Sequence, residues 1–257
     1  MIDDFAKEYL HGDLRWIREA LVWKLDGLGE YDIRRPLTGT GTNLLGLVKH
    51  SAIWEARYFG EVFGRPFPQP LPRWDDEAAS GTDMWATEYE TRDEITGFYR
   101  RVWEHSDATI NVLPIDAPGH VPWWPRPDVK LFNVMVHILT ETSRHAGHAD
   151  ILREQLDGAT GTAAGDPSLD AGPAFWEQRC ATIEQAAQAA AASFEDAGRG
   201  PSLPGWGVQE ILYNVPQPVT RVEHAVMADT GKVDQPGVVS HGFRQLVCHP
   251  GPGERVL

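Results

Sequence analysis

The sequence predicts an all-α protein built around an up-down four-helix bundle. Apolar residues recur at the spacing of three and four that places them on one face of a helix, in several long segments. Residues typical of helix starts and helix ends flank these segments. The stretches between them are rich in Pro and Gly, which indicates loops. Four such helices can bury their apolar faces against one another.

The spacing of apolar residues predicts the first two helices. The first is expected over about residues 13–28, and its apolar positions are Leu14, Ile17, Leu21 and Leu25. The second is expected to begin after Thr42, a good N-cap residue, and to continue to about Phe63. Gly64 and Pro66 then end it, and a Pro-rich loop follows.

The third and fourth helices have clear start and stop signals. Thr91 and Glu94 form the sequence pattern of a capping box, so a helix is expected from there to about Val112. Asp128 is the expected N-cap of the fourth helix, and Gly158 is a good residue to end it.

The remaining residues divide the chain into three parts. Residues 1–158 are the expected bundle, and residues 159–195 are a linker and a fifth helix, at about 174–195, associated with that bundle. Residues 196–257 have clustered Gly and Pro and only short apolar runs. About sixty residues of this kind barely support a core of their own. This irregular extension either packs on the helices or is partly disordered.

Charge excludes two classes of partner. The chain of 257 residues has 23 Lys and Arg against 37 Asp and Glu, a net charge of −14. Nucleic-acid binding needs a basic face that neutralises phosphates, and binding to an anionic membrane surface needs the same. We therefore expect neither a nucleic-acid nor a membrane partner. No apolar run is long enough to span a bilayer, and the first residues do not resemble a secretory signal.

The two cysteines, Cys180 and Cys248, are too few for a disulfide framework or a cysteine zinc site. A cytoplasmic location is the default expectation for such a chain.

The fourth expected helix gathers polar residues that can bind a metal. His137, Glu141, His145 and His148 fall at about 0°, 40°, 80° and 20° around its axis, so they share one side. Residues four apart on a helix have Cβ atoms about 5–6 Å apart, which lets Glu141 and His145 reach one ion. A third ligand must come from another helix.

His50 is the candidate for that third ligand. It occupies the apolar stripe of the second helix, where its polar atoms need a partner. Two histidines and one carboxylate are typical of open catalytic zinc sites, and the same set also binds nickel or iron. The alternatives are that His50 is an ordinary core histidine and that Glu141 pairs with Arg144 or a neighbouring helix. His137 and His148 then either lie around the ligand set without binding the metal, or are exposed to solvent.

Three segments carry a resemblance to a known family. They are residues 47–59, the Trp123-Trp124-Pro125 run, and residues 137–158. Together they resemble the DinB-like superfamily, with the mini-circle protein group as the closest branch, over roughly residues 5–190. Trp123 and Trp124 could line the mouth of a pocket or cover the end of the bundle. Packing in the core is the favoured alternative for both.

The resemblance implies a four-helix bundle that binds a divalent metal, with zinc favoured. It implies His50, Glu141 and His145 as the ligands, in the Glu-x-x-x-His arrangement that is similar to mycothiol-dependent maleylpyruvate isomerase. His137 and His148 then lie outside the ligand set. Arg57 and Arg144 are candidates to hold a carboxylate of the substrate or thiol, and a structural ion pair is the alternative for each.

The resemblance also implies a low-molecular-weight thiol as cosubstrate, mycothiol being favoured over bacillithiol. The chain would transfer the thiol to an electrophile or use it to assist an isomerisation. A free thiol with a pKa near 8.5 is only about 3% thiolate at pH 7, so a metal that deprotonates it aids the reaction.

Two other functions compete with this hypothesis. One is a stress-related bundle that binds metal without catalysis, in which case a homodimer is expected. The other, ranked lower, is a metal-dependent hydrolase. In that enzyme Glu141 could not be the general base, because it would be a metal ligand.

Overall fold

The computed structural model describes residues 4–72, 75–76, 79–166 and 171–197. The chain divides into two compact units. The described residues up to 166 belong to the first unit, and residues 171–197, which include α6 (Pro173–Ala197), belong to the second. The expectations for residues 198–257 lie outside the described residues. Helix α6 agrees closely with the expected fifth helix at 174–195. Its expected association with the bundle stays a prediction.

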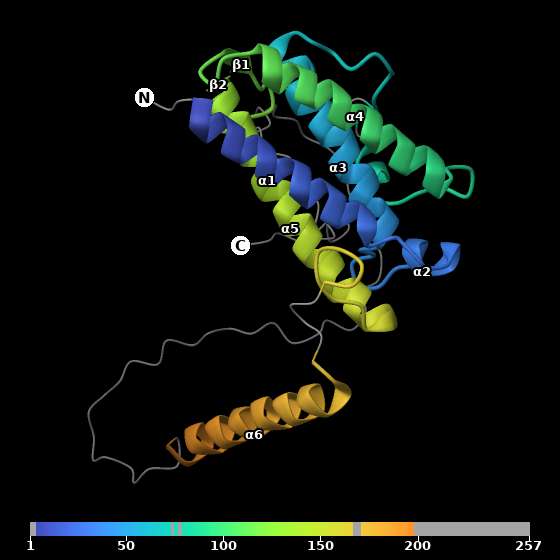
Figure 1. Ribbon diagram of the computed structural model, residues 1–257, viewed down its shortest axis with the longest axis vertical. Coiled ribbons are helices and arrows are strands. Elements are labelled where there is room, and N and C mark those ends of the chain that lie inside the picture. The colour runs from blue at the N-terminus through green and yellow to red at the C-terminus, as the bar shows by residue number, and fades with distance from the viewer. Residues whose placement is uncertain (1–3, 73–74, 77–78, 167–170, 198–257) are drawn as a thin grey trace, which may run out of the picture. The chain divides into compact units, whose positions relative to one another are not determined.

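Four long helices form the bundle (Figure 1), and in the described residues a small sheet and short helices connect them. The long helices are α1 (Asp4–Trp23), α3 (Leu44–Phe59), α4 (Arg92–Val112) and α5 (Leu131–Asp157). The short elements are α2 (Glu30–Arg34), η1 (Glu61–Phe63), η3 (Thr82–Met84), β1 (Pro118–His120) and β2 (Asp128–Lys130). The all-α class is thus confirmed.

The helix directions depart from simple up-down alternation. Arg65, just after α3, donates to Thr109 near the end of α4, and His105 contacts the carbonyl of Arg65. Asn43, just before α3, donates to Met84, which precedes α4. Helices α3 and α4 therefore run in the same direction (Figure 1), because the long connection between them returns the chain to the end where α3 began.

Several helix limits differ from the expected ones. Helix α1 begins nine residues earlier than expected, at Asp4, and ends at Trp23. The N-cap of α3 is Asn43 rather than Thr42, because the Asn43 side chain accepts from the Gly46 amide at 2.8 Å. The second helix stops at Phe59, and η1 takes up the rest of the expected segment.

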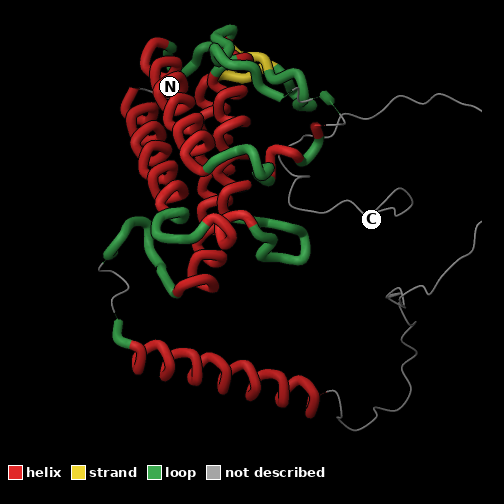
Figure 2. Tube along the Cα trace, turned by 90° about the vertical axis from the view of Figure 1, so that its right-hand side faces the viewer, coloured by secondary structure: helices red, strands yellow, loops and turns green. Residues whose placement is uncertain are grey.

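The start of α5 also differs from the one that the sequence pattern predicts. Asp128 lies in β2, which pairs antiparallel with β1 at one end of the bundle (Figure 2). The helix begins at Leu131, and the Lys130 amide donates to the Asn133 side chain at 2.9 Å. The other signals are confirmed. Thr91 and Glu94 form both bonds of the capping box, and Gly158 ends α5 with a φ of 77°.

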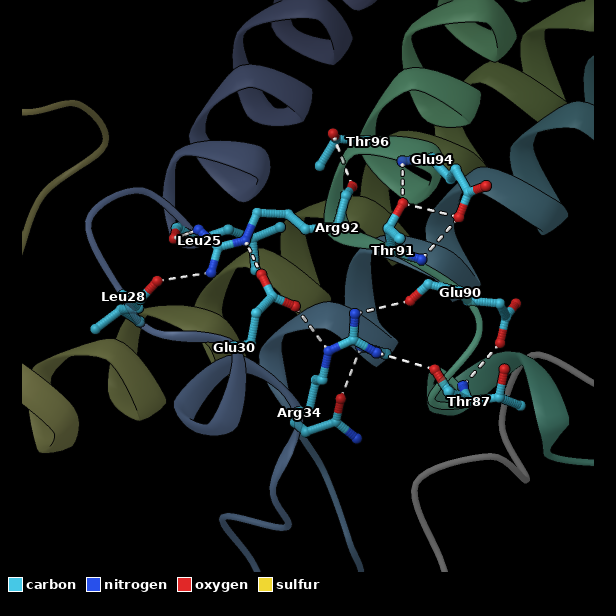
Figure 3. Close-up of polar contacts among 12 residues, drawn as sticks. Leu25, Leu28, Glu30, Arg34, Thr87, Glu90, Thr91, Arg92, Glu94 and Thr96 are labelled. Atoms are coloured by element: carbon cyan, nitrogen blue, oxygen red, sulfur yellow. Dashed lines mark hydrogen bonds and ion pairs between the residues drawn. The ribbon is translucent and has the colours of Figure 1, made fainter.

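Helix α2 was not expected from the sequence, since five residues show no periodicity. Two arginines fix it against the start of α4 (Figure 3). Arg92 donates to Glu30 at 2.9 Å and to the carbonyl of Leu28 at 2.6 Å. Arg34 donates to the carbonyls of Thr87 and Glu90 at 3.0 and 2.7 Å. These contacts close the bundle at this end.

The core of the bundle consists of two apolar clusters. One packs the end of α1 and the start of α3 against the start of α4 and the second half of α5, with Leu21, Leu47, Tyr99 and Leu152 among its members. The other lies at the opposite end and includes Leu14, Phe59, Ile110 and Val134. Between the two clusters, the middle turns of the helices bury polar side chains: Arg18, Glu55, Ser106, Thr142 and His145. So many buried polar groups need hydrogen bonds to one another or to a ligand.

Candidate metal and thiol site

A small cavity lies between α3 and α5, at the level of the buried polar side chains. Helix α3 supplies five lining residues and α5 supplies five. They are His50, Ser51, Trp54, Glu55, Tyr58, His137, Ile138, Glu141, Thr142 and His145. All three residues expected as metal ligands therefore face one cavity.

His145 and Glu141 are adjacent in this cavity. The Nε2 atom of His145 lies 3.8 Å from Oε2 of Glu141, one helical turn away. Burial, with smaller effects from the neighbouring His50, His148 and Arg144, lowers the pKa of His145 to about 2. Burial also raises the pKa of Glu141, although His50 and Arg144 oppose the rise.

Among the described residues, His145 lacks hydrogen-bond partners. Both of its ring nitrogens are buried, and neither has a partner among the residues that the structure describes. A buried polar group without a partner costs about 1–3 kcal/mol. Such an atom therefore points to a ligand, and a neutral imidazole is well suited to bind a metal ion.

His50 lies across the cavity on α3, with its ring centroid 4.8 Å from that of His145. Its Nδ1 atom is 2.7 Å from Oδ2 of Asp83, which also accepts from the Trp54 indole at 2.8 Å. Burial alone would raise the pKa of Asp83, but these contacts hold it below its usual range. The carboxylate thus accepts a hydrogen bond from Nδ1–H and leaves Nε2 as the nitrogen available to a ligand.

Asp83 was not identified from the sequence. It lies on η3, in the long connection between α3 and α4, and no local pattern indicates that this connection folds back onto α3. Gly46 makes the contact possible, because a Cβ there would lie 1.8 Å from the Met84 carbonyl oxygen. A glycine on an otherwise apolar helix face was the available signal of a close backbone approach.

The donor types at this cavity fit a divalent ion, although the side chains stand too far apart to enclose one. Within the described part of the chain, no three His, Cys, Asp or Glu side chains are grouped closely enough to hold a metal in their present positions. The orphaned nitrogens of His145 and the fixed tautomer of His50 are the features that favour an ion. Glu141 adds the negative charge that such a site uses.

The aromatic wall of the cavity includes His137. Its ring lies between Tyr58 and Trp124, with centroids 4.8 Å from each. Burial lowers the pKa of His137 to about 4, so it is neutral at pH 7. Trp123 is 1% exposed and belongs to the core, as favoured from the sequence.

Three other candidates lie outside the cavity lining. The Arg57 guanidinium contacts both oxygens of Glu61 at 3.1 Å, which fits a structural ion pair. Burial, and then the charge of the exposed Arg144 on α5, lowers the pKa of His148. The ring centroid of His148 is 5.9 Å from that of His145. The expected position of His148 beside the ligand set, rather than in it, stays a prediction.

A buried ion network supports the back of the cavity. Arg18 on α1 donates to both carboxylate oxygens of Glu55, at 3.0 and 2.7 Å, and to Asp107 on α4 at 2.7 Å. Arg18 and Glu55 are each about 1% exposed. This network joins α1, α3 and α4 and includes the lining residue Glu55, and it was not expected from the sequence.

Comparison with known protein families gives a match to the bundle. The sequence model of the Mycothiol-S-transferase family matches residues 9–158, which is more than half of the chain. The chain belongs to the mycothiol S-transferase family. This family is part of the DinB-like clan, so the resemblance seen in the sequence is confirmed at that level. A comparison with curated proteins gives no match.

The mycothiol S-transferase match covers the helical bundle from α1 to the end of α5. It includes every lining residue of the cavity, whereas α6 lies beyond it. No helix in the described residues is both long and apolar enough to cross a membrane.

Proposed function

We propose that this chain transfers a low-molecular-weight thiol, with mycothiol favoured, to an electrophilic small molecule. The family match supports a thiol-dependent activity. The observation that carries the assignment to this cavity is His145, whose two buried ring nitrogens lack partners within the described residues. A related reaction, isomerisation assisted by the thiol, would use the same cavity.

A divalent metal is the second part of the proposal, with His50, Glu141 and His145 as its ligands. Two imidazoles and one carboxylate leave a coordination position open, as in catalytic zinc sites. Zinc is favoured, although nickel and iron accept the same donors. Side-chain movements within the cavity would be needed to close this set around an ion. A metal here would lower the pKa of a bound thiol and raise its thiolate fraction at neutral pH.

The residues around these donors have separate tasks in the proposal. Asp83 orients His50 through Nδ1, and the Arg18–Glu55 pair holds the wall of α3 in place. The aromatic side chains Trp54, Tyr58 and His137 exclude water from the reacting atoms. Arg144, exposed near Glu141, is the candidate to contact a polar group of the thiol.

A hydrolase is less well supported by this arrangement. It needs a carboxylate near the ligands that can act as a general base. Glu55 is the further carboxylate in the cavity lining, and Arg18 binds both of its oxygens. The cytoplasmic location, a homodimer and the mini-circle branch stay predictions.

Thiol binding is measured by thermal unfolding of zinc-loaded protein with increasing mycothiol. We expect a saturable rise in Tm, because a ligand at 100 times its Kd stabilises the folded state by about 2.7 kcal/mol. The His145→Ala variant should lose this rise, while His120→Ala, which changes an exposed histidine of β1, should keep it. Absence of a rise with mycothiol, bacillithiol and glutathione would overturn the proposal.

A further inference from the structure

Helix α6 exposes large apolar side chains along its length. Every residue from 172 to 192 is exposed, and Phe175, Trp176 and Ile183 are 52%, 37% and 58% exposed. Helices in proteins are stabilised mainly by packing an apolar face against another element. A helix of 25 residues that leaves such side chains in water therefore indicates a partner.

The apolar residues of α6 repeat with the spacing of a coiled coil. Successive members of the stripe are four, three, four and three positions apart: Trp176, Cys180, Ile183, Ala187 and Ala190. In heptad notation Cys180 and Ala187 are a positions, and the other three are d positions. Glutamines occupy the opposite side of the helix. This pattern is typical of a helix that packs along one other helix.

The charges beside this stripe favour a second, parallel α6 as that other helix. Arg179 is the g position before Cys180, and Glu184 is the e position after Ile183. In a parallel coiled coil a g residue faces the e residue five positions later on the other helix. Arg179 of each copy then faces Glu184 of the partner subunit, which gives two ion pairs in a symmetric dimer.

An antiparallel pair of α6 helices fits the charges less well. In that arrangement e positions face e positions, and both charged e residues, Glu177 and Glu184, are acidic. The carboxylate of Glu184 also accepts from Gln188 at 2.8 Å, one turn further along the helix. This contact neutralises no charge, so a cation from another chain remains the complementary neighbour for Glu184.

We infer that α6 is a dimerisation helix, and that its partner is α6 of a second copy of this chain, parallel and in register. This inference does not depend on the proposed thiol transfer. Trp176 and Ile183 of the two copies bury each other, and the small side chains of Ala187 and Ala190 allow the helices to approach closely. The same arrangement sets Cys180 opposite its counterpart.

The first test measures the oligomeric state of the full-length protein by sedimentation velocity over a range of concentrations. We expect a dimer for the wild type. Ile183→Glu should raise the dimer Kd on the order of 100-fold, because two like charges then face each other in the stripe. Ile151→Glu on α5 is the matched control, since Ile151 is 57% exposed, and it should keep the wild-type Kd.

Two outcomes of this measurement would overturn the inference. One is a monomeric wild type, as follows if α6 packs on its own bundle. The other is a dimer that Ile183→Glu leaves intact, because another surface would then join the copies.

The second test reverses the charges beside the stripe. Arg179→Glu should raise the dimer Kd about tenfold, because two attractive contacts become repulsive. Adding Glu184→Arg to the same chain should restore the wild-type Kd, since opposite charges face each other again. A double variant that dimerises no better than the single one would contradict the parallel arrangement.

The third test locates the contact by disulfide formation. In a Cys248→Ser background, Cys180 is the remaining cysteine, and mild oxidation should link the two copies through it. Moving the thiol to the opposite side of α6, by Cys180→Ser with Gln188→Cys, should largely prevent this link. Equal yields of linked dimer from the two proteins would show that the stripe is not the contact surface.

Discussion

A single glycine on α3 allows the connection that orients the proposed ligand His50. Gly46 packs so tightly against the Met84 carbonyl that an added Cβ has no space. Asp83, the neighbour of Met84, then reaches His50 across the same contact. The missing side chain at one position therefore determines the tautomer of a histidine one turn further along the helix.

Gly46→Ala should destabilise the protein by about 1–3 kcal/mol, because the Met84 backbone must move to admit a methyl group. Denaturant unfolding measures this loss. Gly12→Ala is the matched control on α1, where nothing lies within 4 Å of the new Cβ. This control should gain about 0.5–1 kcal/mol from helix propensity. A Gly46→Ala protein as stable as wild type would show that the contact is not as close as described.

Asp83→Asn tests the orientation of His50 without a change in size. The amide weakens the interaction that fixes the Nδ1 proton, so we expect zinc affinity to fall about 10–100-fold. Competition with a chromophoric chelator measures the affinity. Asp128→Asn, whose carboxylate contacts the exposed His120, is the control. Equal zinc affinity in the wild type and both variants would show that Asp83 has no role in metal binding.

His137 should make the stability of the metal-free protein depend on pH. Its pKa is about 4 in the folded protein, against about 6.5 when unfolded, so the unfolded state binds more protons between these values. The contribution of neutral His137 to stability is therefore fully present above pH 6.5 and is lost as the pH drops towards 4. Between pH 7 and pH 5 the wild type should lose about 2 kcal/mol more than His137→Phe. Urea unfolding at both pH values tests this, and parallel losses would refute it.

At the scale of the elements, the Arg18–Glu55–Asp107 network joins α1, α3 and α4 in the middle of the bundle. The sequence shows these polar residues, but Glu55 and Asp107 lie 37 and 89 positions from Arg18. Helical periodicity orders residues around one axis and gives no information about which helix faces which. For this reason the network could not be predicted.

Glu55→Leu should destabilise the protein by about 3–5 kcal/mol, since it leaves the Arg18 charge buried without its main partner. Replacing both residues, as Arg18→Met with Glu55→Leu, should recover most of that loss, because the buried charge is gone. Guanidinium unfolding of the three proteins gives the comparison. A double variant no more stable than the single one would contradict this interpretation of the network.

The helices themselves were largely predictable. Apolar spacing and the capping box placed α4 well, and Gly158 gave the end of α5. The predicted N-caps of α3 and α5 were wrong, because another residue or a strand took the expected place. Asp128 looks like an N-cap but pairs in a strand, and Asn43 takes the capping role from the adjacent Thr42. Helix α2 depends on contacts with residues that come much later in the chain, so local sequence does not reveal it.

At the scale of the whole bundle, the fold brings polar residues of α3 and α5 to one cavity between two apolar clusters. The three proposed ligands were named from helical spacing and a family resemblance, and they line that cavity. The contact of Asp83 with His50 required the tertiary structure, since it depends on a segment between the helices. The direction of α4 relative to α3 also required it, because the length of a loop does not determine where the loop returns.

The most direct measurement is the metal content of protein purified without an affinity tag, by mass spectrometry. We expect about one equivalent of zinc, nickel or iron in the wild type. The His145→Ala variant should contain almost none, whereas His120→Ala should match the wild type. A wild-type protein that is empty and also fails to take up added metal would contradict the proposed metal site. His50, Glu141 and His145 would then line a cavity without a metal.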